Sequence, residues 1–210
     1  QVLVNPELTA MSEERDEDWE GCLSLPDLRG RVPRLKSIRV RALDRAGRRR
    51  THVHTFGNLI HADFRIPSSD YGDLLKVTSV LTRNHTDVVA AFRHMVFNVA
   101  THNRDDHVKN FAFLLDDVTG EWSLSPAYDL TFASGPGGEH CMTVAGEGRH
   151  PGRRHILQLA RQHGIASKAA TIVIDEVRAT VDAWPRFAEQ ATVHPDAAAQ
   201  IATTLPTLDE

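Results

Sequence analysis

The chain has 210 residues, enough for one domain or two small ones, and 41% hydrophobic with 25% charged residues is ordinary for a globular protein. A formal net charge of −4 excludes the strong basic excess of dedicated nucleic-acid-binding proteins. No apolar run approaches the about 18 to 20 residues that span a bilayer, and no signal peptide is recognisable. Two cysteines, Cys22 and Cys141, are too few for a disulfide framework and fit a reducing cytoplasm.

Charge is unevenly distributed along the chain. Residues 12–20 hold six acids and one base, whereas residues 29–50 hold ten bases and one acid. Beyond Arg50 there are 13 bases and 19 acids. Solvated strand faces are the simplest interpretation of such runs. Contact with RNA or an acidic protein is the alternative, but the aromatic residues that stack on bases are missing there. The change predicts a domain boundary near residue 50.

The region before that boundary carries short strand-like runs. They cover residues 2–4, 22–25 and 37–43, and Asn, Pro and Gly turn signals separate them. Beyond Pro67 the pattern becomes mostly helical. The predicted fold class is therefore α+β, with a short β-rich N-terminal segment followed by a mostly helical part.

Helix signals divide this second part into five segments. Ser69 or Asp70 can cap a helix that runs to about residue 81. A helix over 84–100 follows, then one over about 154–163, one over 167–184 that Pro185 ends or kinks, and a short last helix that begins at Pro195. In the second of these, apolar side chains at helical spacing predict the core: Val88, Phe92, Met95, Val96 and Val99.

The residues with chemical potential lie between 101 and 131. A polar segment, residues 101–110, follows the helix and leads into two strand-like runs, 111–115 and 122–124, that predict a hairpin. Another acid, Asp129, comes after the hairpin. Asp105 and Asn110 have the Asp-x-x-x-x-Asn spacing with which protein kinases place the catalytic base and a metal-binding amide.

Phosphoryl transfer gives each of these residues a role. Asp105 would accept the proton of the attacking hydroxyl, while Asn110 and Asp129 would hold Mg²⁺ against the nucleotide phosphates. Lys109 could neutralise charge on the transferred group, and His107 could brace the loop. The spacing alone is common in proteins. In the alternative interpretation, Asp105 or its neighbour Asp106 simply caps a turn.

The same segment resembles the HipA-like serine/threonine kinases, the toxin components of bacterial type II toxin–antitoxin systems. The stretch Asp-Asp-His-Val-Lys-Asn-Phe-Ala-Phe-Leu starts at Asp105, and Leu-Ser-Pro-Ala-Tyr-Asp-Leu ends at Leu130. Residues 54–57, 61–65 and 142–149 match as well, so the resemblance covers about 52–205.

This resemblance implies a protein-kinase-like C-terminal lobe with the hairpin in its catalytic loop. It implies Asp105 as catalytic base, Asn110 and Asp129 as Mg²⁺ ligands, and His107 and Lys109 as catalytic-loop residues. ATP would be the phosphoryl donor and a protein the substrate, in some members an aminoacyl-tRNA synthetase. A DNA-binding, HipB-like antitoxin would be the partner. We expect no direct contact with nucleic acid and none with a membrane.

The chain departs from the family at the nucleotide-binding N-terminal lobe. A complete member has a phosphate-covering loop and a lysine on a strand. Here only Lys36, Lys76, Lys109 and Lys168 are available, and no Gly-rich loop precedes the catalytic segment. Residues 135–138 follow Asp129 and are interpreted as a flexible loop. We therefore expect impaired transfer.

Residues 1–50 resemble peptide deformylase instead. The matching stretches are residues 2–8, 12–14, 19–24, 28–34 and 38–44, and Glu-Gly-Cys-Leu-Ser around Cys22 is the most specific. The resemblance implies that Cys22 binds Fe, Ni or Zn with two histidines of a His-Glu-x-x-x-His helix. No His-Glu dipeptide occurs in the chain, so Cys22 is only a weak metal-ligand candidate and an ordinary strand cysteine is favoured. Cys141 is interpreted as a small apolar filler.

The sequence thus predicts two incomplete parts, a deformylase-like β fragment over 1–50 and a HipA-like kinase lobe over 51–205, in a cytoplasmic protein. Because it begins with Gln1 inside a strand-like run, we expect the chain to be a fragment. The leading hypothesis is Mg-ATP-dependent phosphorylation of a protein. The alternatives are a non-catalytic decoy that binds an antitoxin or substrate, and a metal-dependent hydrolase of N-formylmethionine.

Overall fold

The fold is taken from a computed structural model of the whole chain, which describes residues 4–10, 14–22, 25–35, 38–44, 47–63, 69–116 and 118–208. Side chains are described for 14–15, 51–63, 69–116 and 118–208, except Pro136. The chain divides into two compact units. The first comprises 1–54 and 114–122, the second 55–113 and 123–210. Each is described by itself.

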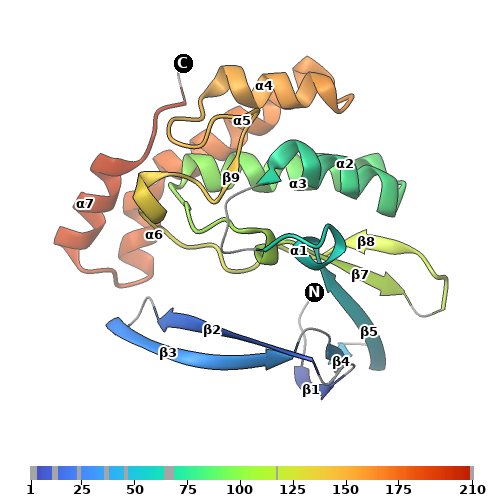
Figure 1. Cartoon of the computed structure of the whole chain (residues 1–210). Coiled ribbons are helices and arrows are strands. Elements are labelled where there is room, and N and C mark those ends of the chain that lie inside the picture. The colour runs from blue at the N-terminus through green and yellow to red at the C-terminus, as the bar shows by residue number, and fades with distance from the viewer. Residues whose placement is uncertain are drawn as a thin grey trace. The chain divides into compact units, whose positions relative to one another are not determined.

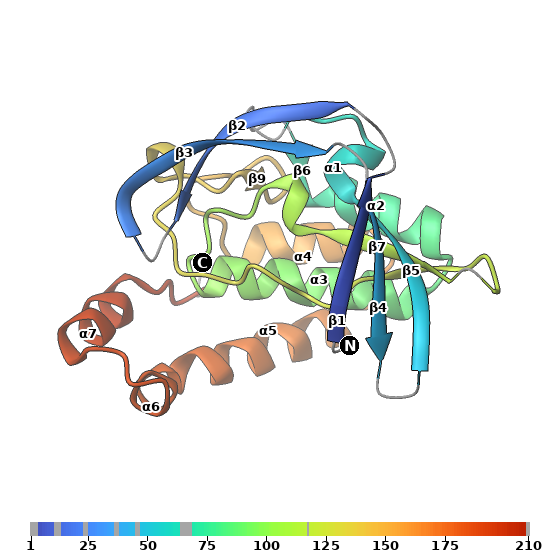
Figure 2. The same cartoon turned by 90° about the horizontal axis from the view of Figure 1, so that it is seen from below.

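The first unit is built from antiparallel strands. Three of them run side by side in Figure 2: β1 (Val4–Ala10), β4 (Ile38–Asp44) and β5 (Gly47–Thr55). The sheet has the strand order β1-β4-β5-β7-β8. Its last two strands are β7 (Ala112–Asp116) and β8 (Trp122–Leu124). The sequence boundaries between the two units fall within these strands, after Phe113 and after Trp122. β7 and β8 form the predicted hairpin, in which the Asp116 N–H donates to the Glu121 carbonyl at 2.9 Å.

A second pair of strands corrects one prediction. β2 (Arg15–Cys22) and β3 (Leu25–Leu35) form a hairpin in which Arg15 lies opposite Leu35 and Cys22 opposite Leu25. The predicted single strand over 22–25 is therefore wrong, because Cys22 ends β2 and Leu25 begins its antiparallel partner β3, while residues 23 and 24 lie outside the described residues. The short apolar run contained no indication of where the partner strand would begin.

The second unit is mostly helical (Figure 1). Its elements are α1 (Phe56–Leu59), β6 (Ser69–Asp70), α2 (Tyr71–Thr82), α3 (His85–Ala100), η1 (Val108–Asn110), η2 (Pro136–Gly138), β9 (Met142–Thr143), α4 (Arg153–Gln162), α5 (Ser167–Asp182), α6 (Trp184–Gln190) and α7 (Pro195–Thr204). Among the described residues, no helix is both long and apolar enough for a membrane crossing. The predicted α+β class is confirmed, with its β-rich N-terminal segment and mostly helical remainder.

Local capping explains where α2 and α3 begin. The Asp70 carboxylate accepts from the Gly72 N–H at 2.7 Å, and the Asp73 carboxylate accepts from the Asp70 N–H at 3.2 Å, which completes a capping box. The Asn84 side chain accepts from the Thr86 N–H at 3.0 Å. Both predicted starts are confirmed, with Asp70 as the N-cap of α2.

The long C-terminal helix ends earlier than predicted. α5 stops at Asp182, and Trp184 begins α6 with Pro185 in its first turn. A proline fits the first turn of a helix, where the backbone N–H has no partner within the helix, so Pro185 starts an element here and does not kink one. Pro195 is the first residue of α7, as predicted.

The core of this unit surrounds α3. The five predicted core positions, Val88, Phe92, Met95, Val96 and Val99, are all at most 2% exposed. α3 packs against α2 and α5 (Figure 1), and α5 also packs against α4. β9 pairs in parallel with β6, with Ser69 beside Met142. This pairing brings the chain after residue 139 back to the start of α2.

Candidate active site

The polar loop begins at the C-terminus of α3. Thr101 ends the helix, with its N–H and its hydroxyl both donating to the Phe97 carbonyl, at 2.8 and 2.7 Å. His102 then adopts φ 56°, and the Asn103 N–H donates to the Asn98 carbonyl at 2.9 Å. A left-handed residue directly after a helix reverses the chain direction and lets the last carbonyls find donors. The turn delivers Asp105 and Asp106 away from the helix axis.

Asp105 and Asn110 are brought together by the chain itself. The Asn110 side-chain amide donates through Nδ2 to the Asp105 carbonyl at 2.8 Å, and the Asn110 N–H donates to the His107 carbonyl at 2.9 Å. Asn110 is 5% exposed. Because Nδ2 makes this bond, the orientation of Oδ1, the only amide atom that can bind a cation, is fixed.

Asp129 acts electrostatically on Asp105. Burial raises the pKa of the Asp105 carboxyl, the charges of Asp129 and Asp106 raise it further, and His107 opposes them. Asp129 itself is exposed and has φ 56°. A carboxylate and an amide oxygen are hard oxygen donors of the kind that Mg²⁺ takes, so Asp129 and Asn110 fit this ion in their chemistry.

The remaining predicted residues lie on the same loop. His107 is the N-cap of η1, and Lys109 lies within η1, where its carbonyl accepts from the Tyr128 hydroxyl at 2.5 Å. Burial, followed by the charge of Asp129, raises the pKa of Tyr128 to about 12, so this phenol keeps its proton as the donor. This bond ties the residue before Asp129 to the loop that carries Asn110.

The structure describes the side chain of only one of the two cysteines, Cys141. Cys22 ends β2, and its side chain lies outside the described residues, as does Lys36. Within the described part, no three His, Cys, Asp or Glu side chains form a metal-binding cluster. Cys141 is buried, as predicted for a filler, and burial together with the charges of Asp106 and Asp105 raises its pKa to about 12.

Sequence reasoning missed the role of Asp106 in the interior. Its carboxylate is 0% exposed and accepts from the Tyr71 hydroxyl at 2.7 Å and the Cys141 N–H at 2.8 Å, while His140 Nδ1 lies 2.8 Å from Oδ2. Burial, then the Asp106 charge, raises the pKa of Tyr71 well above its ordinary value. A second acid beside the candidate base was the available signal, but the sequence does not show which of the two faces inward.

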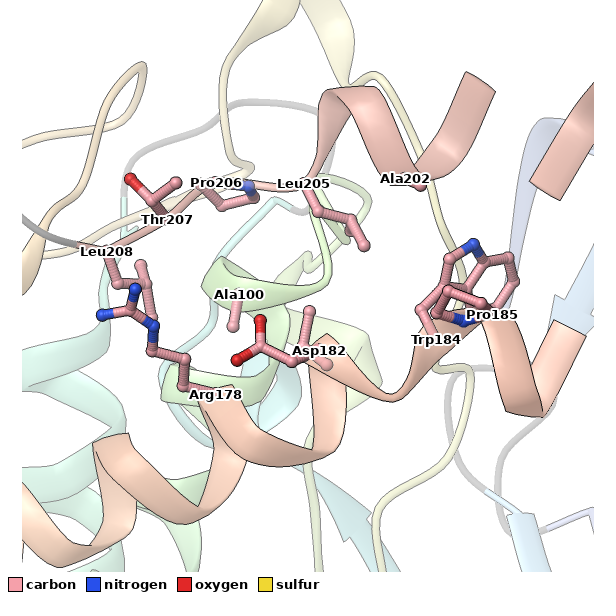
Figure 3. Close-up of a pocket in the computed structure, with 11 residues that line it drawn as sticks. Ala100, Arg178, Asp182, Trp184, Pro185, Ala202, Leu205, Pro206, Thr207 and Leu208 are labelled. Carbon is pink, nitrogen blue, oxygen red and sulfur yellow. The ribbon is translucent and has the colours of Figure 1, made fainter. Parts of the chain in front are cut away.

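Two cavities lie elsewhere in this unit. One, of about 280 Å³, is shown in Figure 3, where Arg178 and Asp182 extend from α5 toward the segment from Leu205 to Leu208. The other, also about 280 Å³, is mainly apolar and includes Leu130 to Phe132, directly after Asp129. Neither lining includes Asp105, Asn110 or Asp129. The second cavity therefore shares a chain segment with the candidate site but not its polar residues.

Comparison with curated proteins finds similarity at the N-terminus. The polypeptide deformylase family model matches residues 1–57. Peptide deformylase 1 of Nitrosomonas europaea is 54% identical over 46 residues, which is 22% of this chain and 26% of that protein. Peptide deformylase 1 of Bordetella pertussis is 50% identical over 48 residues, 23% of this chain and 27% of that protein. The chain thus spans about a quarter of the length of these relatives.

The larger part of the chain matches a different family. A solved complex of HipA, HipB and operator DNA from a Shewanella oneidensis MR-1 toxin–antitoxin system contains a chain with the same fold. The TM-score is 0.56 at 14% identity, over 93% of this chain and 46% of that one. The family model for the HipA-like C-terminal domain matches residues 30–184. The two resemblances found in the sequence are confirmed, and the chain belongs to the HipA-like C-terminal domain family.

Proposed function

We propose that the part of the chain from residue 51 to about 205 transfers a phosphoryl group from Mg-ATP to a serine or threonine hydroxyl of a protein. The contact that carries this proposal is the hydrogen bond from the Asn110 amide to the Asp105 carbonyl, at 2.8 Å. The Asp129 charge, which raises the Asp105 pKa, supports it. The candidate base is therefore bonded to the amide ligand and affected by the charge of the second carboxylate, and the three residues follow the chain order that phosphoryl transfer uses.

Asp105 is the proposed base. Its raised pKa makes it a better acceptor for the hydroxyl proton than an ordinary aspartate, because a base works best when its pKa approaches the ambient pH. Asn110 through Oδ1 and Asp129 through its carboxylate would hold the metal. Mg²⁺ supplies positive charge against the phosphate oxygens. Lys109 would neutralise charge on the transferred group, and His107 would keep the base ionised.

The test is transfer of labelled phosphate from Mg-ATP to protein substrates, for which an aminoacyl-tRNA synthetase is the first choice. We expect Asp105→Asn and Asp129→Asn each to reduce the rate by about 10² to 10⁴-fold, the contribution of a positioned proton-transfer group or a comparable electrostatic one. Asp129→Asn should also raise the Mg²⁺ concentration that transfer requires.

Asp175→Asn is the matched control. Asp175 lies on α5 with its side chain 61% exposed and forms an ion pair of 3.6 Å with Arg153. The substitution makes the same chemical change on the surface, so transfer should stay within about twofold of the wild type, as expected of a surface ion pair worth little. Equal transfer by wild-type protein and Asp105→Asn would reject the kinase proposal.

A second candidate function is binding of a HipB-like antitoxin without catalysis, in the cytoplasm. It is supported by the fold shared with a chain of the Shewanella oneidensis complex, whose other components are HipB and operator DNA. Retention of a purified HipB-like antitoxin by both the wild type and Asp105→Asn, with no transfer by either, would favour this function. Deformylase activity is not proposed, because that similarity is confined to residues 1–57 and the chain lacks the His-Glu dipeptide.

A further inference from the structure

The polar residue beside the proposed base faces the protein interior. Asp105 is half-buried, whereas Asp106 is 0% exposed and lies among three partners: Tyr71, His140 and Cys141. A carboxylate can only accept hydrogen bonds, so Nδ1 of His140 carries the proton in that contact. The three partners come from α2 and from the chain after residue 139, neither of which is adjacent to residue 106 in sequence.

A chain of hydrogen bonds continues from Asp106 to Asp129. The Tyr71 hydroxyl, which donates to Asp106, accepts from Asn98 Nδ2 at 2.9 Å. Asn98 Oδ1 accepts from Asn103 Nδ2 at 3.0 Å, and Asn103 Nδ2 also lies 3.5 Å from the Asp129 carbonyl. Asn98 and Asn103 are each 1% exposed, so water does not compete for these bonds. The backbone of one proposed metal ligand is thereby connected to the residue next to the proposed base.

Asp106 also anchors segment 139–149. Besides His140 and Cys141, this segment is held by Asp70, whose carboxylate accepts from the Thr143 hydroxyl at 2.6 Å and the Gly146 N–H at 2.9 Å. Two residues before Asp106, the Arg104 guanidinium donates to the Arg149 carbonyl at 2.8 Å. The sequence matched residues 142–149 to the family without a role for them. Arg149, at the end of that range, contacts the loop through Arg104, and the two residues just before the range, His140 and Cys141, contact it through Asp106.

We propose that Asp106 is a positioning residue, which holds the Asp105 loop, the Asp129 backbone and segment 139–149 in one fixed arrangement. The effect of this positioning on catalysis depends on the proposed kinase function. An asparagine at this position has one acceptor oxygen and two amide hydrogens, so it cannot accept from three donors. Buried donors left without an acceptor are costly, and the loop must shift to reach other partners.

Kinetics of phosphoryl transfer test the catalytic consequence. We expect Asp106→Asn to reduce kcat by about 10 to 100-fold with KM for ATP and substrate within about twofold, since small misplacement of a reacting group costs up to about 10²-fold. Tyr71→Phe removes one hydroxyl from the chain of bonds and should reduce kcat by a smaller factor. Thr78→Val is the control. Thr78 lies on α2, as Tyr71 does, is 0% exposed, and its hydroxyl donates to the Leu74 carbonyl at 2.7 Å, outside the chain of bonds from Asp106. A kcat for Asp106→Asn as high as that of Thr78→Val would overturn the proposal.

Melting temperatures test the positioning itself without any assay of transfer. The Tm shifts of Asp106→Asn and Tyr71→Phe should sum to more than the shift of the double variant, because residues in one network are not additive. Thr78→Val combined with Asp106→Asn should give additive shifts. Additive Tm shifts for Asp106→Asn and Tyr71→Phe would overturn the positioning role of Asp106. A wild type without transfer but with coupled Tm shifts would instead reject the kinase function and leave the network established.

Discussion

Two adjacent carboxylates in this protein have opposite environments. Asp105 is half-buried, with a raised pKa caused first by burial and then by the charges of Asp129 and Asp106. Asp106 is 0% exposed and accepts bonds from two donors besides its contact with His140. These environments agree with the proposed roles, proton exchange for Asp105 and positioning for Asp106. Neighbouring residues of the same type would then divide chemistry and positioning between them.

The raised pKa of Asp105 predicts how its replacement changes stability with pH. A carboxyl whose pKa is higher in the folded state stabilises the fold fully only below its unfolded pKa, about 3.9, and this contribution is lost as pH rises through the folded pKa. Asp105→Asn should therefore raise the Tm at pH 7, and the gain should vanish below about pH 4, near the unfolded pKa. Thermal denaturation at a series of pH values measures this. A Tm difference that is constant with pH would contradict it.

The same residues show what the sequence could predict of the site. Asp105, Asn110 and Asp129 could be proposed from the sequence because their spacing is local and their residue types are chemically restrictive. The partners of Asp106 were not found, because Tyr71 and Cys141 each lie 35 residues away and only tertiary packing joins them. Besides the paired acids, Asn98, a polar residue among core positions of α3, was a local signal that something polar lies inside.

At the scale of elements, the loop between Asp129 and His140 depends on glycine conformation. Gly135 has φ +73°, and a Cβ there would meet the Glu139 carbonyl oxygen and would lie 2.6 Å from Arg104 Cβ. Gly137 has φ +63° but nothing within 4 Å of such a Cβ. The two positions share left-handed backbone and differ in available space. This difference makes them a matched pair.

Alanine at these two glycines should have unequal effects. Gly137→Ala adds only the strain of left-handed backbone, about 1 to 2 kcal/mol in the free energy of unfolding. Gly135→Ala adds that strain and overpacking against Arg104 and Glu139, about 1 to 3 kcal/mol more. Urea denaturation of both variants measures the difference. Equal free energies of unfolding would mean that segment 135–139 does not pack against Arg104 as described.

Element boundaries were predictable where the signal is a side chain that caps the backbone. Asp70, Asn84 and Pro195 mark helix starts that the structure has at the same positions. The prediction failed at residues 22–25 and after Asp182. At residues 22–25, the strand boundaries depend on which residues pair across the hairpin. After Asp182, Trp184 and Pro185 are compatible both with continuation of one helix and with the start of the next. Local sequence does not decide between such alternatives.

At the scale of the whole molecule, two family models match this chain, and the ranges of residues that they match overlap. The deformylase model ends at residue 57 and the HipA-like model begins at residue 30, so the charge change near residue 50 falls inside the shared range. The solved HipA complex contains a chain of which this one covers 46%. Composition alone could not show this, because averages over 210 residues conceal a change of character along them.

Within the helical unit, burial is concentrated around α3 and is low at the C-terminal helices. α3 contributes eight buried residues, whereas α7 contributes none of its ten. α7 packs against α6, and the Trp184 indole N–H donates to the Ala198 carbonyl at 3.0 Å. Regions with few buried apolar contacts open locally at a small fraction of the global free energy of unfolding. The two helices should therefore differ in how they open.

Amide hydrogen exchange measures this difference directly. We expect amides of α3 to exchange only through global unfolding and those of α7 through local opening, with protection factors lower by about 10²-fold or more. Trp184→Phe should lower protection in α7 further, because it removes the indole bond to Ala198, while α3 is unchanged. Equal protection in both helices would show that α6 and α7 unfold together with the core. In that case the indole bond and the α6–α7 packing would contribute more stability than their exposure indicates.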